Sequence, residues 1–215
     1  SFGVADISDV KAMQLRSLLK NFQSFSVREK SALNIVKKIT GKNGVCHIDP
    51  TLLLKKDEWQ KISVKKIDKP YILVFNVKPV KSLIDFAEKL SKKTGIPVVY
   101  ITDNPQKKRK NFTYVSAPTV EEFLGYFANA DYTVTNSFHG TAFSVIFHKN
   151  MFVEYETAKG FNHRAKNLLQ TIGINREIKD GEAVTTDIDW NKVDNILQAE
   201  RKLSLDYLKD IIKGE

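Results

Sequence analysis

The 215-residue sequence contains a single cysteine, Cys46. One cysteine excludes an internal disulfide and any metal site built from several cysteines, so a disulfide-built secreted fold is not expected. No apolar run approaches the roughly 20 residues that a membrane-spanning helix needs. The glycine-rich patterns of dinucleotide and nucleoside-triphosphate sites and the GxSxG pattern of serine hydrolases are also missing. A soluble, cytoplasmic protein is the simplest interpretation.

Charge is abundant but does not identify a partner. The sequence has 34 Lys plus Arg against 25 Asp plus Glu, a formal charge of +9, and 42% of its residues are hydrophobic, which excludes a disordered chain. The positive surplus suits nucleic acid, an anionic membrane surface or acidic small molecules equally well. The densest basic run, 107–110, contains no aromatic residue, so we expect a solvated loop, with a phosphate-contacting patch as the alternative.

Strand-like and helical patterns alternate along the chain, which predicts parallel strands joined by helices. The predicted strands are 25–27, 45–48, 71–77, 98–101, 112–115, 132–135 and 151–153. The predicted helices are 9–22, 29–40, 79–94, 119–129, 141–147, 164–172 and one from 190 onward. Segment 55–69 interrupts the pattern and is interpreted as a linker. We therefore expect residues 1–68 to be the C-terminal part of an incomplete Rossmann-like domain plus the linker, and residues 69–215 to be a complete one.

The turn 135–141 is the sharpest candidate site. It ends a buried strand and begins an apolar helix, and ligands of parallel sheets bind at such strand ends, near helix N-termini. In one interpretation Asn136 or Ser137 caps the helix, Gly140 permits the tight turn and His139 is a half-buried histidine with its hydrogen bonds satisfied. In the other, His139 is placed for proton transfer or for contact with an anion, because its ordinary pKa lies near neutrality.

Other polar positions give weaker signals. Arg28 follows a strand and begins a helix, so its guanidinium either reaches over the strand end toward a carboxylate or phosphate, or pairs with a glutamate on the surface. Arg164 and Arg176 flank a predicted helix and are either anion ligands or ordinary surface residues. Glu154 and Glu156 are two apart, a spacing common in solvated strands. The histidines are not spaced as metal ligands, and no metal site is predicted.

The segment 128–147, ANADYTVTNSFHGTAFSVIF, is similar to the signature of the polysaccharide pyruvyltransferase family. Further motifs that resemble the family occur in the same order along the chain: Ser1-Phe2-Gly3, Ser26-Val27-Arg28-Glu29, Asp49-Pro50-Thr51-Leu52-Leu53, Ala117-Pro118 with Glu121 to Leu124, and then Asn162, Arg164, Leu168-Leu169, Gly173 and Arg176. The resemblance covers nearly the whole chain. Because family members are longer, it also suggests that most of a first domain would precede Ser1.

The resemblance implies an α/β fold of two Rossmann-like domains, similar to B-type glycosyltransferases, with the active site between them. It implies transfer of pyruvate from phosphoenolpyruvate to two sugar hydroxyls as a ketal, in surface polysaccharide biosynthesis. The partners would be phosphoenolpyruvate and a saccharide or lipid-linked glycan, with no further cofactor and no nucleic acid. The enzyme would work in the cytoplasm, in peripheral contact with the inner face of the membrane.

The same resemblance suggests roles for individual residues. His139 would be the catalytic residue, as general acid or in contact with the leaving phosphate. The residues expected to bind substrate are Arg28, Asn136, Ser137, Gly140, Arg164 and Arg176. Some family members have Arg-x-His-Gly where this chain has Ser137 before the histidine. Two alternatives therefore stay open: a glycosyltransferase that uses a nucleotide sugar, and a non-catalytic module that binds glycans or anions.

Overall fold

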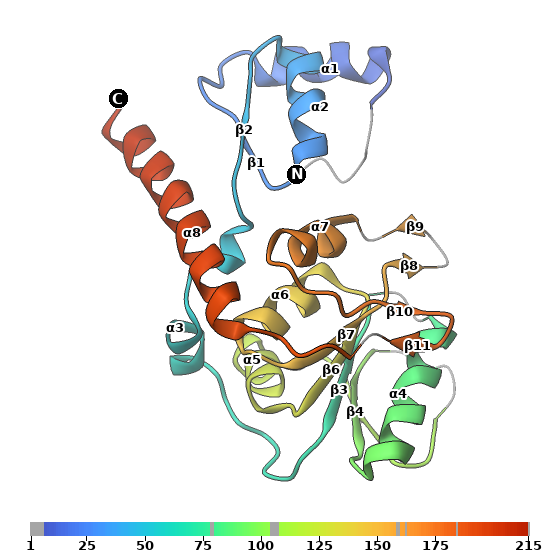
Figure 1. Ribbon diagram of the computed structural model, residues 1–215. Coiled ribbons are helices and arrows are strands. Elements are labelled where there is room, and N and C mark those ends of the chain that lie inside the picture. The colour runs from blue at the N-terminus through green and yellow to red at the C-terminus, as the bar shows by residue number, and fades with distance from the viewer. Residues whose placement is uncertain are drawn as a thin grey trace. The chain divides into compact units, whose positions relative to one another are not determined.

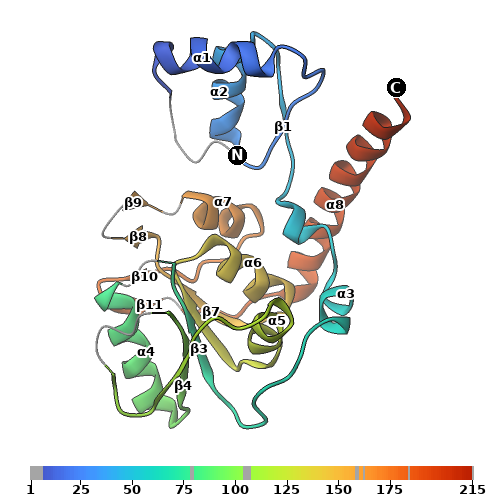
Figure 2. The same ribbon diagram turned by 180° about the vertical axis from the view of Figure 1, so that it is seen from behind.

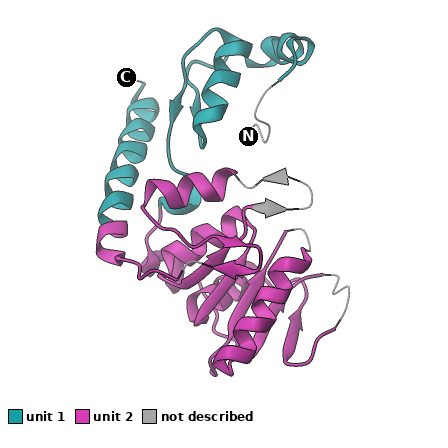
Figure 3. Ribbon diagram, turned by 45° about the vertical axis from the view of Figure 1, so that its right-hand side comes forward, with its two compact units in different colours: residues 1–53, 195–215 teal, residues 54–194 magenta. Residues whose placement is uncertain are grey.

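The computed structural model describes residues 7–77, 80–103, 108–157, 160–161, 163–183 and 185–214. The chain forms two compact units (Figure 3). Unit 1 comprises Ser1–Leu53 and Asn195–Glu215, and unit 2 comprises Leu54–Asp194. This division differs from the predicted boundary at 68–69, because segment 55–69 packs in unit 2 and the C-terminal residues go with unit 1. The predicted start at Ser1-Phe2-Gly3 lies outside the described residues.

Unit 2 is built on a parallel five-stranded sheet with the strand order β5-β4-β3-β6-β7 (Figures 1 and 2). Its strands are β3 (Ile72–Phe75), β4 (Val98–Ile101), β5 (Phe112–Val115), β6 (Tyr132–Thr135) and β7 (Asn150–Val153). The central strand β3 comes from the continuous apolar run of the sequence, as expected for a strand covered on both faces. The predicted parallel α/β fold is confirmed. Strands β4 and β5 extend the sheet on one side of β3, and the chain then returns so that β6 and β7 extend it on the other side. The topological switch point therefore lies between β3 and β6.

Helices cover both faces of this sheet. Helix α4 (Lys81–Thr94) packs on one face, where Leu83 and Ala87 are fully buried against Val74 and Val134. Helices α5 (Val120–Asn129) and α6 (Phe138–Ile146) lie on the other face (Figure 1). Full burial of one leucine stabilises the fold by about 1.5–3 kcal/mol. Helix α6 starts three residues earlier than predicted, because Ser137 caps it. The predicted first residue of α4, Pro79, lies outside the described residues.

Segment 55–69 is not the irregular linker that the sequence suggested. It contains α3 (Lys56–Lys61), and beyond this helix the Val64 amide donates to the carbonyl of Glu121 on α5 over 2.9 Å. A Cβ atom at Gly125 would lie 1.8 Å from the Val64 carbonyl oxygen. The segment can therefore cross α5 this closely only because residue 125 is glycine.

The remaining elements of unit 2 are short and follow β7. Two antiparallel pairs, β8 (Glu156–Thr157) with β9 (Gly160–Phe161) and β10 (Ile178–Lys179) with β11 (Glu182–Ala183), were not predicted. Helix α7 (His163–Thr171) packs on α6. A parallel bridge between Val153 and Glu177 adds one residue pair beyond β7. The polypeptide after the helix thus returns to the edge of the sheet.

Unit 1 contains α1 (Asp9–Leu19), β1 (Ser26–Val27), α2 (Lys30–Thr40), β2 (Val45–Cys46), the short 3₁₀ helix η1 (Pro50–Leu52) and most of α8 (Trp190–Lys213). Strands β1 and β2 are parallel. The predicted helix 9–22 is present, but its apolar positions Val10, Met13 and Leu18 are exposed, and Ala12 packs instead against Ile35 and Ile39. None of the described helices combines the length and apolar character needed to cross a membrane.

Candidate functional site

The turn from β6 into α6 is ordered by hydrogen bonds of its own polar side chains. Thr135 Oγ1 accepts from the Ser137 amide over 3.0 Å, and Ser137 Oγ accepts from the Gly140 amide over 3.3 Å. Ser137 is therefore the N-cap, which confirms the capping part of the first interpretation of this turn. The half-buried histidine of that interpretation is wrong, because His139 is exposed. Asn136 Oδ1 accepts from the Val77 amide over 3.2 Å and so joins the ends of β6 and β3. Asn136 and Ser137 are 6% and 3% exposed.

Gly140 has a packing role in this structure. A Cβ atom at this position would lie 2.3 Å from Thr135 Oγ1 and 3.2 Å from a ring carbon of Phe75. The first turn of α6 can approach the sheet this closely only with glycine at residue 140. The expectation that Gly140 contacts substrate stays a prediction.

His139 is the second residue of α6 and is exposed. Its neighbour Phe138 carries the guanidinium of Arg164 over its ring, with the central guanidinium carbon 3.7 Å from the ring centroid. The first helical N–H groups have no carbonyl partner within the helix, and the helix dipole favours negative charge at this end. The structure thus places the Arg164 guanidinium on Phe138, the residue before His139, in the first turn of this helix. Asn162, also part of the resemblance, lies outside the described residues.

Arg176 lies beside β7 and is 5% exposed. Its backbone carbonyl accepts from the Val153 amide, and its guanidinium lies 5.6 Å from the ring centroid of Phe152. Its Nε atom is buried without a hydrogen-bond partner, and no ion pair joins it to a described carboxylate. Burial lowers the pKa of Arg176, partly offset by the negative charge of Asp187. A guanidinium so poorly compensated favours an anionic ligand.

Asn76, which follows the central strand β3, was not predicted as a site residue. It is 8% exposed, and its Oδ1 atom accepts from the hydroxyl of Tyr100 on β4 over 2.8 Å. Its Nδ2 atom is buried with no hydrogen-bond partner. The predicted strand 71–77 contained Asn76, and only the observed end of β3 at Phe75 gives Asn76 the same position after a buried strand that singled out Asn136. Near the end of β7, burial raises the pKa of Tyr155 to about 12, so its hydroxyl stays protonated at neutral pH.

Arg28 belongs to unit 1 and pairs with an aspartate rather than with the predicted glutamate. Its Nη1 atom lies 2.5 Å from Asp49 Oδ2, and the two side chains are 30% and 2% exposed. Burial alone would raise the pKa of Asp49, but hydrogen bonds from Thr51 and the charge and hydrogen bond of Arg28 outweigh it and hold that pKa below its ordinary value. The guanidinium is thus fixed at one end and reachable from solvent at the other.

A pocket of about 390 Å³ in unit 1 includes Arg28 in its wall. Its polar wall also contains Ser26, whose hydroxyl lies 3.0 Å from His47 Nδ1, and the His47 ring lies 4.5 Å from that of Tyr207 on α8. The sequence contained no signal for Tyr207, because its neighbours in the pocket are far away along the chain.

Comparison with known proteins decides the family. A sequence model described as polysaccharide pyruvyl transferase matches residues 1–155, well over half of the chain. The chain belongs to this family. Of the predicted site residues, Arg28, Asn136, Ser137, His139 and Gly140 lie within the matched region, and Arg164 and Arg176 lie beyond it.

A search of curated proteins found no match. Among solved structures, the UDP-GlcNAc 2-epimerase from Methanocaldococcus jannaschii is similar, with 12% identity and a TM-score of 0.41 over 78% of this chain. The chain spans 44% of the length of that structure.

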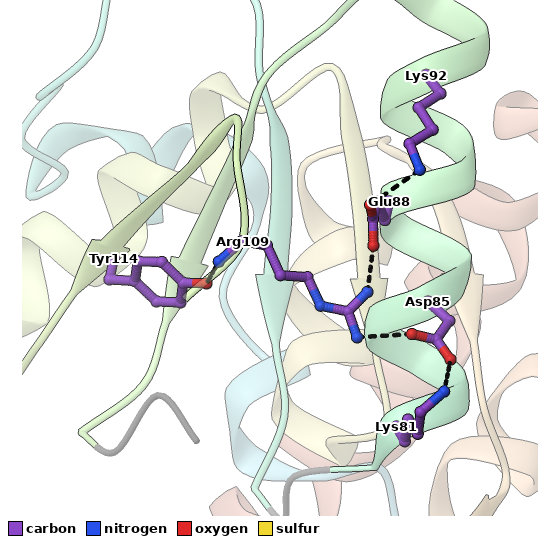
Figure 4. A network of polar contacts seen from close by, with 6 residues as sticks. All are labelled: Lys81, Asp85, Glu88, Lys92, Arg109 and Tyr114. Atoms are coloured by element: carbon purple, nitrogen blue, oxygen red, sulfur yellow. Dashed lines mark hydrogen bonds and ion pairs between the residues drawn. The ribbon is translucent and has the colours of Figure 1, made fainter. Parts of the chain in front are cut away.

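In this member of the family, the basic run 107–110 is not simply a solvated loop. Lys107 lies outside the described residues, but Arg109 reaches α4 (Figure 4). Its Nη2 atom lies 2.6 Å from Asp85 Oδ1, and its Nη1 atom pairs with Glu88. Arg109 is thereby neutralised and offers little charge to a phosphate.

Within the described ranges, no three His, Cys, Asp or Glu side chains gather as a metal site would require.

Proposed function

We propose that this family member transfers pyruvate from phosphoenolpyruvate to two hydroxyls of a sugar, as a ketal, in the biosynthesis of a surface polysaccharide. The observation that carries the proposal is the exposed imidazole of His139 in the first turn of α6, where the Arg164 guanidinium lies over the ring of the preceding residue, Phe138. Family membership supports transfer to a saccharide. The donor, the ketal product and a lipid-linked acceptor are parts of the proposal.

The reaction needs groups of the kind found at this helix terminus. The methylene carbon of phosphoenolpyruvate gains a proton, two sugar oxygens bond to its central carbon, and the bond from that carbon to the phosphate oxygen breaks. Of the two hydroxyl protons, one balances the new methyl group and the other leaves with the phosphate. His139 in its protonated form would donate to the methylene carbon or to the leaving phosphate. No further cofactor is required.

Cationic side chains would bind the anionic donor. Arg164 lies over the ring of Phe138 in the first turn of α6, and the buried Arg176 forms no ion pair among the described residues. Arg28 in unit 1 would bind a carboxylate or phosphate with the part of its guanidinium that Asp49 leaves open. Guanidinium groups suit these oxyanions because their donors match them in pairs.

The decisive experiment incubates the protein with phosphoenolpyruvate and a panel of glycans and measures phosphate release. We expect release that depends on the acceptor and falls about 100-fold or more in His139→Ala. His148→Ala is the matched control, because His148 bonds to Asp194 and stacks on Trp190, apart from the α6 turn. No release with any acceptor, or equal activity of the His139→Ala variant, would refute the proposal.

Two further measurements separate the alternatives. If nucleoside diphosphates raise the melting temperature more than phosphoenolpyruvate does, a nucleotide-sugar glycosyltransferase is favoured. If Ser137→Arg gains activity that the natural protein lacks, the natural chain is a non-catalytic binding module. That substitution also removes a helix cap, at a cost of about 1 kcal/mol.

We propose that the protein is localised in the cytoplasm, in peripheral contact with the inner face of the membrane. The formal charge of +9 supports attraction to anionic lipid. Co-sedimentation with vesicles that contain phosphatidylglycerol, compared with neutral phosphatidylcholine vesicles, tests this part. Equal recovery with both kinds of vesicle would contradict it.

A further inference from the structure

The α4 face of the unit 2 sheet ends in a row of polar side chains. Val74, Val134 and Phe152 lie at one level of the sheet and belong to the core beneath α4. Side chains alternate between faces along a strand, so the residues two positions later, at the carboxyl ends of these strands, return to that face. These residues are Asn76, Asn136 and Glu154, and we refer to them as the polar row.

Two hydrogen bonds confirm the placement of Asn76 and Glu154. Tyr100, which is level with Val74 on β4, donates its hydroxyl proton to Asn76 Oδ1. Ser82 in the first turn of α4 donates to Glu154 Oε1 over 2.5 Å. Glu154 is 7% exposed, so it is not the solvated strand carboxylate that its spacing suggested. The polar row thus lies next to the start of α4, at the switch point where parallel sheets bind ligands.

Asn76 is the member whose hydrogen bonding is incomplete. Its amide oxygen is held by Tyr100, while its Nδ2 atom has no partner and no contact with water. Buried amide groups in native proteins almost always have partners, and an exception calls for a reason. A ligand oxygen that accepts from Nδ2 supplies that reason.

The chemistry of the row selects the ligand class. An amide donor together with a carboxylate acceptor suits hydroxyl groups, which both accept and donate hydrogen bonds. The negative charge of Glu154 disfavours an anion, and the row contains no cationic side chain. The groups suited to an anionic donor are elsewhere, at the start of α6 and on Arg164 and Arg176.

We propose that the polar row is the subsite for the acceptor sugar, in which Asn76 Nδ2 donates to a hydroxyl oxygen and Glu154 accepts from a hydroxyl group. This inference rests on the proposed function and adds to it a location and a residue. It predicts that Asn76 Nδ2 contributes to acceptor binding, whereas Asn76 Oδ1 contributes to the fold by accepting from Tyr100.

The test measures binding without requiring turnover. Saturation-transfer NMR with methyl glycosides of glucose, galactose, mannose, N-acetylglucosamine and N-acetylmannosamine reports sugar binding, and a separate titration with inorganic phosphate reports anion binding. We expect Asn76→Ala to weaken binding of the best glycoside about 5- to 10-fold. Phosphate affinity should stay unchanged. The melting temperature should fall, because the buried hydroxyl of Tyr100 loses its acceptor, and the control variant below shows whether such a loss by itself weakens sugar binding.

Asn129→Ala is the matched control. The Nδ2 atom of Asn129 donates to the Gly125 carbonyl over 2.8 Å, so this amide in the same unit is satisfied by the protein. Its loss should lower the melting temperature and leave glycoside binding unchanged. Both variants should therefore lower the melting temperature, and only Asn76→Ala should weaken glycoside binding.

Three outcomes would overturn the inference: no glycoside binds the natural protein, Asn76→Ala lowers the melting temperature without weakening glycoside binding, or Asn76→Ala weakens phosphate binding alone. Glycoside binding that depends on Asn76 would support the subsite even without phosphate release from phosphoenolpyruvate. In that case the proposed pyruvyl transfer is refuted, whereas the proposed sugar subsite is supported.

Discussion

Two arginines, one in each unit, show how differently the same side chain can be held. Arg28 in unit 1 is 30% exposed at its side chain and forms an ion pair with the buried carboxylate of Asp49. Arg176 in unit 2 is 5% exposed, has no ion pair among the described residues, and keeps its Nε atom buried without a partner.

This difference in pairing distinguishes an arginine that stabilises the fold from one that is available to bind an anion. Asp49 depends on Arg28 because a buried carboxylate is costly without a cation. No described carboxylate forms an ion pair with Arg176, and the charge of Asp187 offsets the burial of its guanidinium only in part, so we propose that a bound anion compensates it further. Arg28 should therefore matter for stability and Arg176 for binding.

Removal of the Arg28 guanidinium should have the largest effect. In Arg28→Met, Asp49 keeps only its hydrogen bonds from Thr51, so unit 1 should lose about 2–3 kcal/mol of stability. Both tryptophans, Trp59 and Trp190, belong to unit 2, so hydrogen exchange of peptides covering 26–53 is the suitable probe.

Arg16→Met is the control for this loss. Arg16 donates to the Ile39 carbonyl over 2.8 Å and compensates no buried carboxylate in the described structure, so we expect a loss of about 1 kcal/mol. Equal losses of stability in the two variants would contradict the prediction that compensation of the buried Asp49 carboxylate makes Arg28 more important than Arg16.

The stability difference between the natural protein and Arg28→Met should depend on pH. The folded state holds the pKa of Asp49 below its ordinary value of 3.8. The pair therefore contributes fully above pH 3.8, and its contribution is lost as the pH falls from there through the lower folded-state value. Urea titrations followed by hydrogen exchange between pH 2.5 and pH 7 should show the two curves converging at the acid end; a constant gap would contradict this assignment.

Arg176→Met should change stability little and in the opposite direction. Replacing a buried, unpaired charge by an apolar side chain of similar length should leave unit 2 unchanged or stabilise it by up to about 1 kcal/mol. Tryptophan fluorescence during urea unfolding measures this effect. Affinity for inorganic phosphate should fall at the same time, and a clear loss of stability with unchanged phosphate affinity would place Arg176 with Arg28 as a structural residue.

A small effect is also expected at Arg109. Its contacts with Asp85 and Glu88 join the loop after β4 to α4, but the two carboxylates are 35% and 33% exposed (Figure 4). Arg109→Met should cost about 0.5–1 kcal/mol, and added salt should reduce the difference. A loss of stability in Arg109→Met as large as that in Arg28→Met would contradict the prediction that ion pairs with partly exposed carboxylates contribute less than the pair with buried Asp49.

The regular part of the fold could be predicted from local patterns. Strands β4, β5 and β6 were predicted with their observed bounds, and Gly41 and Gly95 end α2 and α4 in the left-handed conformation that suits glycine. Segment 55–69 could not be predicted, because its place depends on the close crossing permitted by Gly125, which is distant in sequence. Helix α1 was found, but its buried face was not, since small Ala12 packs inward while larger apolar residues are exposed.

The candidate site was predicted in part. The strand-to-helix turn with Ser137 and His139 could be located because a polar cluster after a buried strand is a local signal. The Arg28–Asp49 pair joins residues 21 apart, and its partner was predicted wrongly. The unsatisfied amide of Asn76 depends on Tyr100 from the neighbouring strand and on burial beneath other groups, neither of which follows from residue order.

The sequence by itself determined the alternation of strands and helices, the family and the chemical groups available for a reaction, because these depend on periodicity, caps and short motifs. Only the tertiary structure decided which charges are compensated and which are not. Arg28, Arg109 and Arg176 look alike in the sequence, but the fold gives each a different environment. Arg28 pairs with a buried carboxylate, and Arg109 pairs with two partly exposed carboxylates. Arg176 is buried without an ion pair among the described residues, which makes it a candidate ligand for an anion. The cost of burying a charge depends on its neighbours in space.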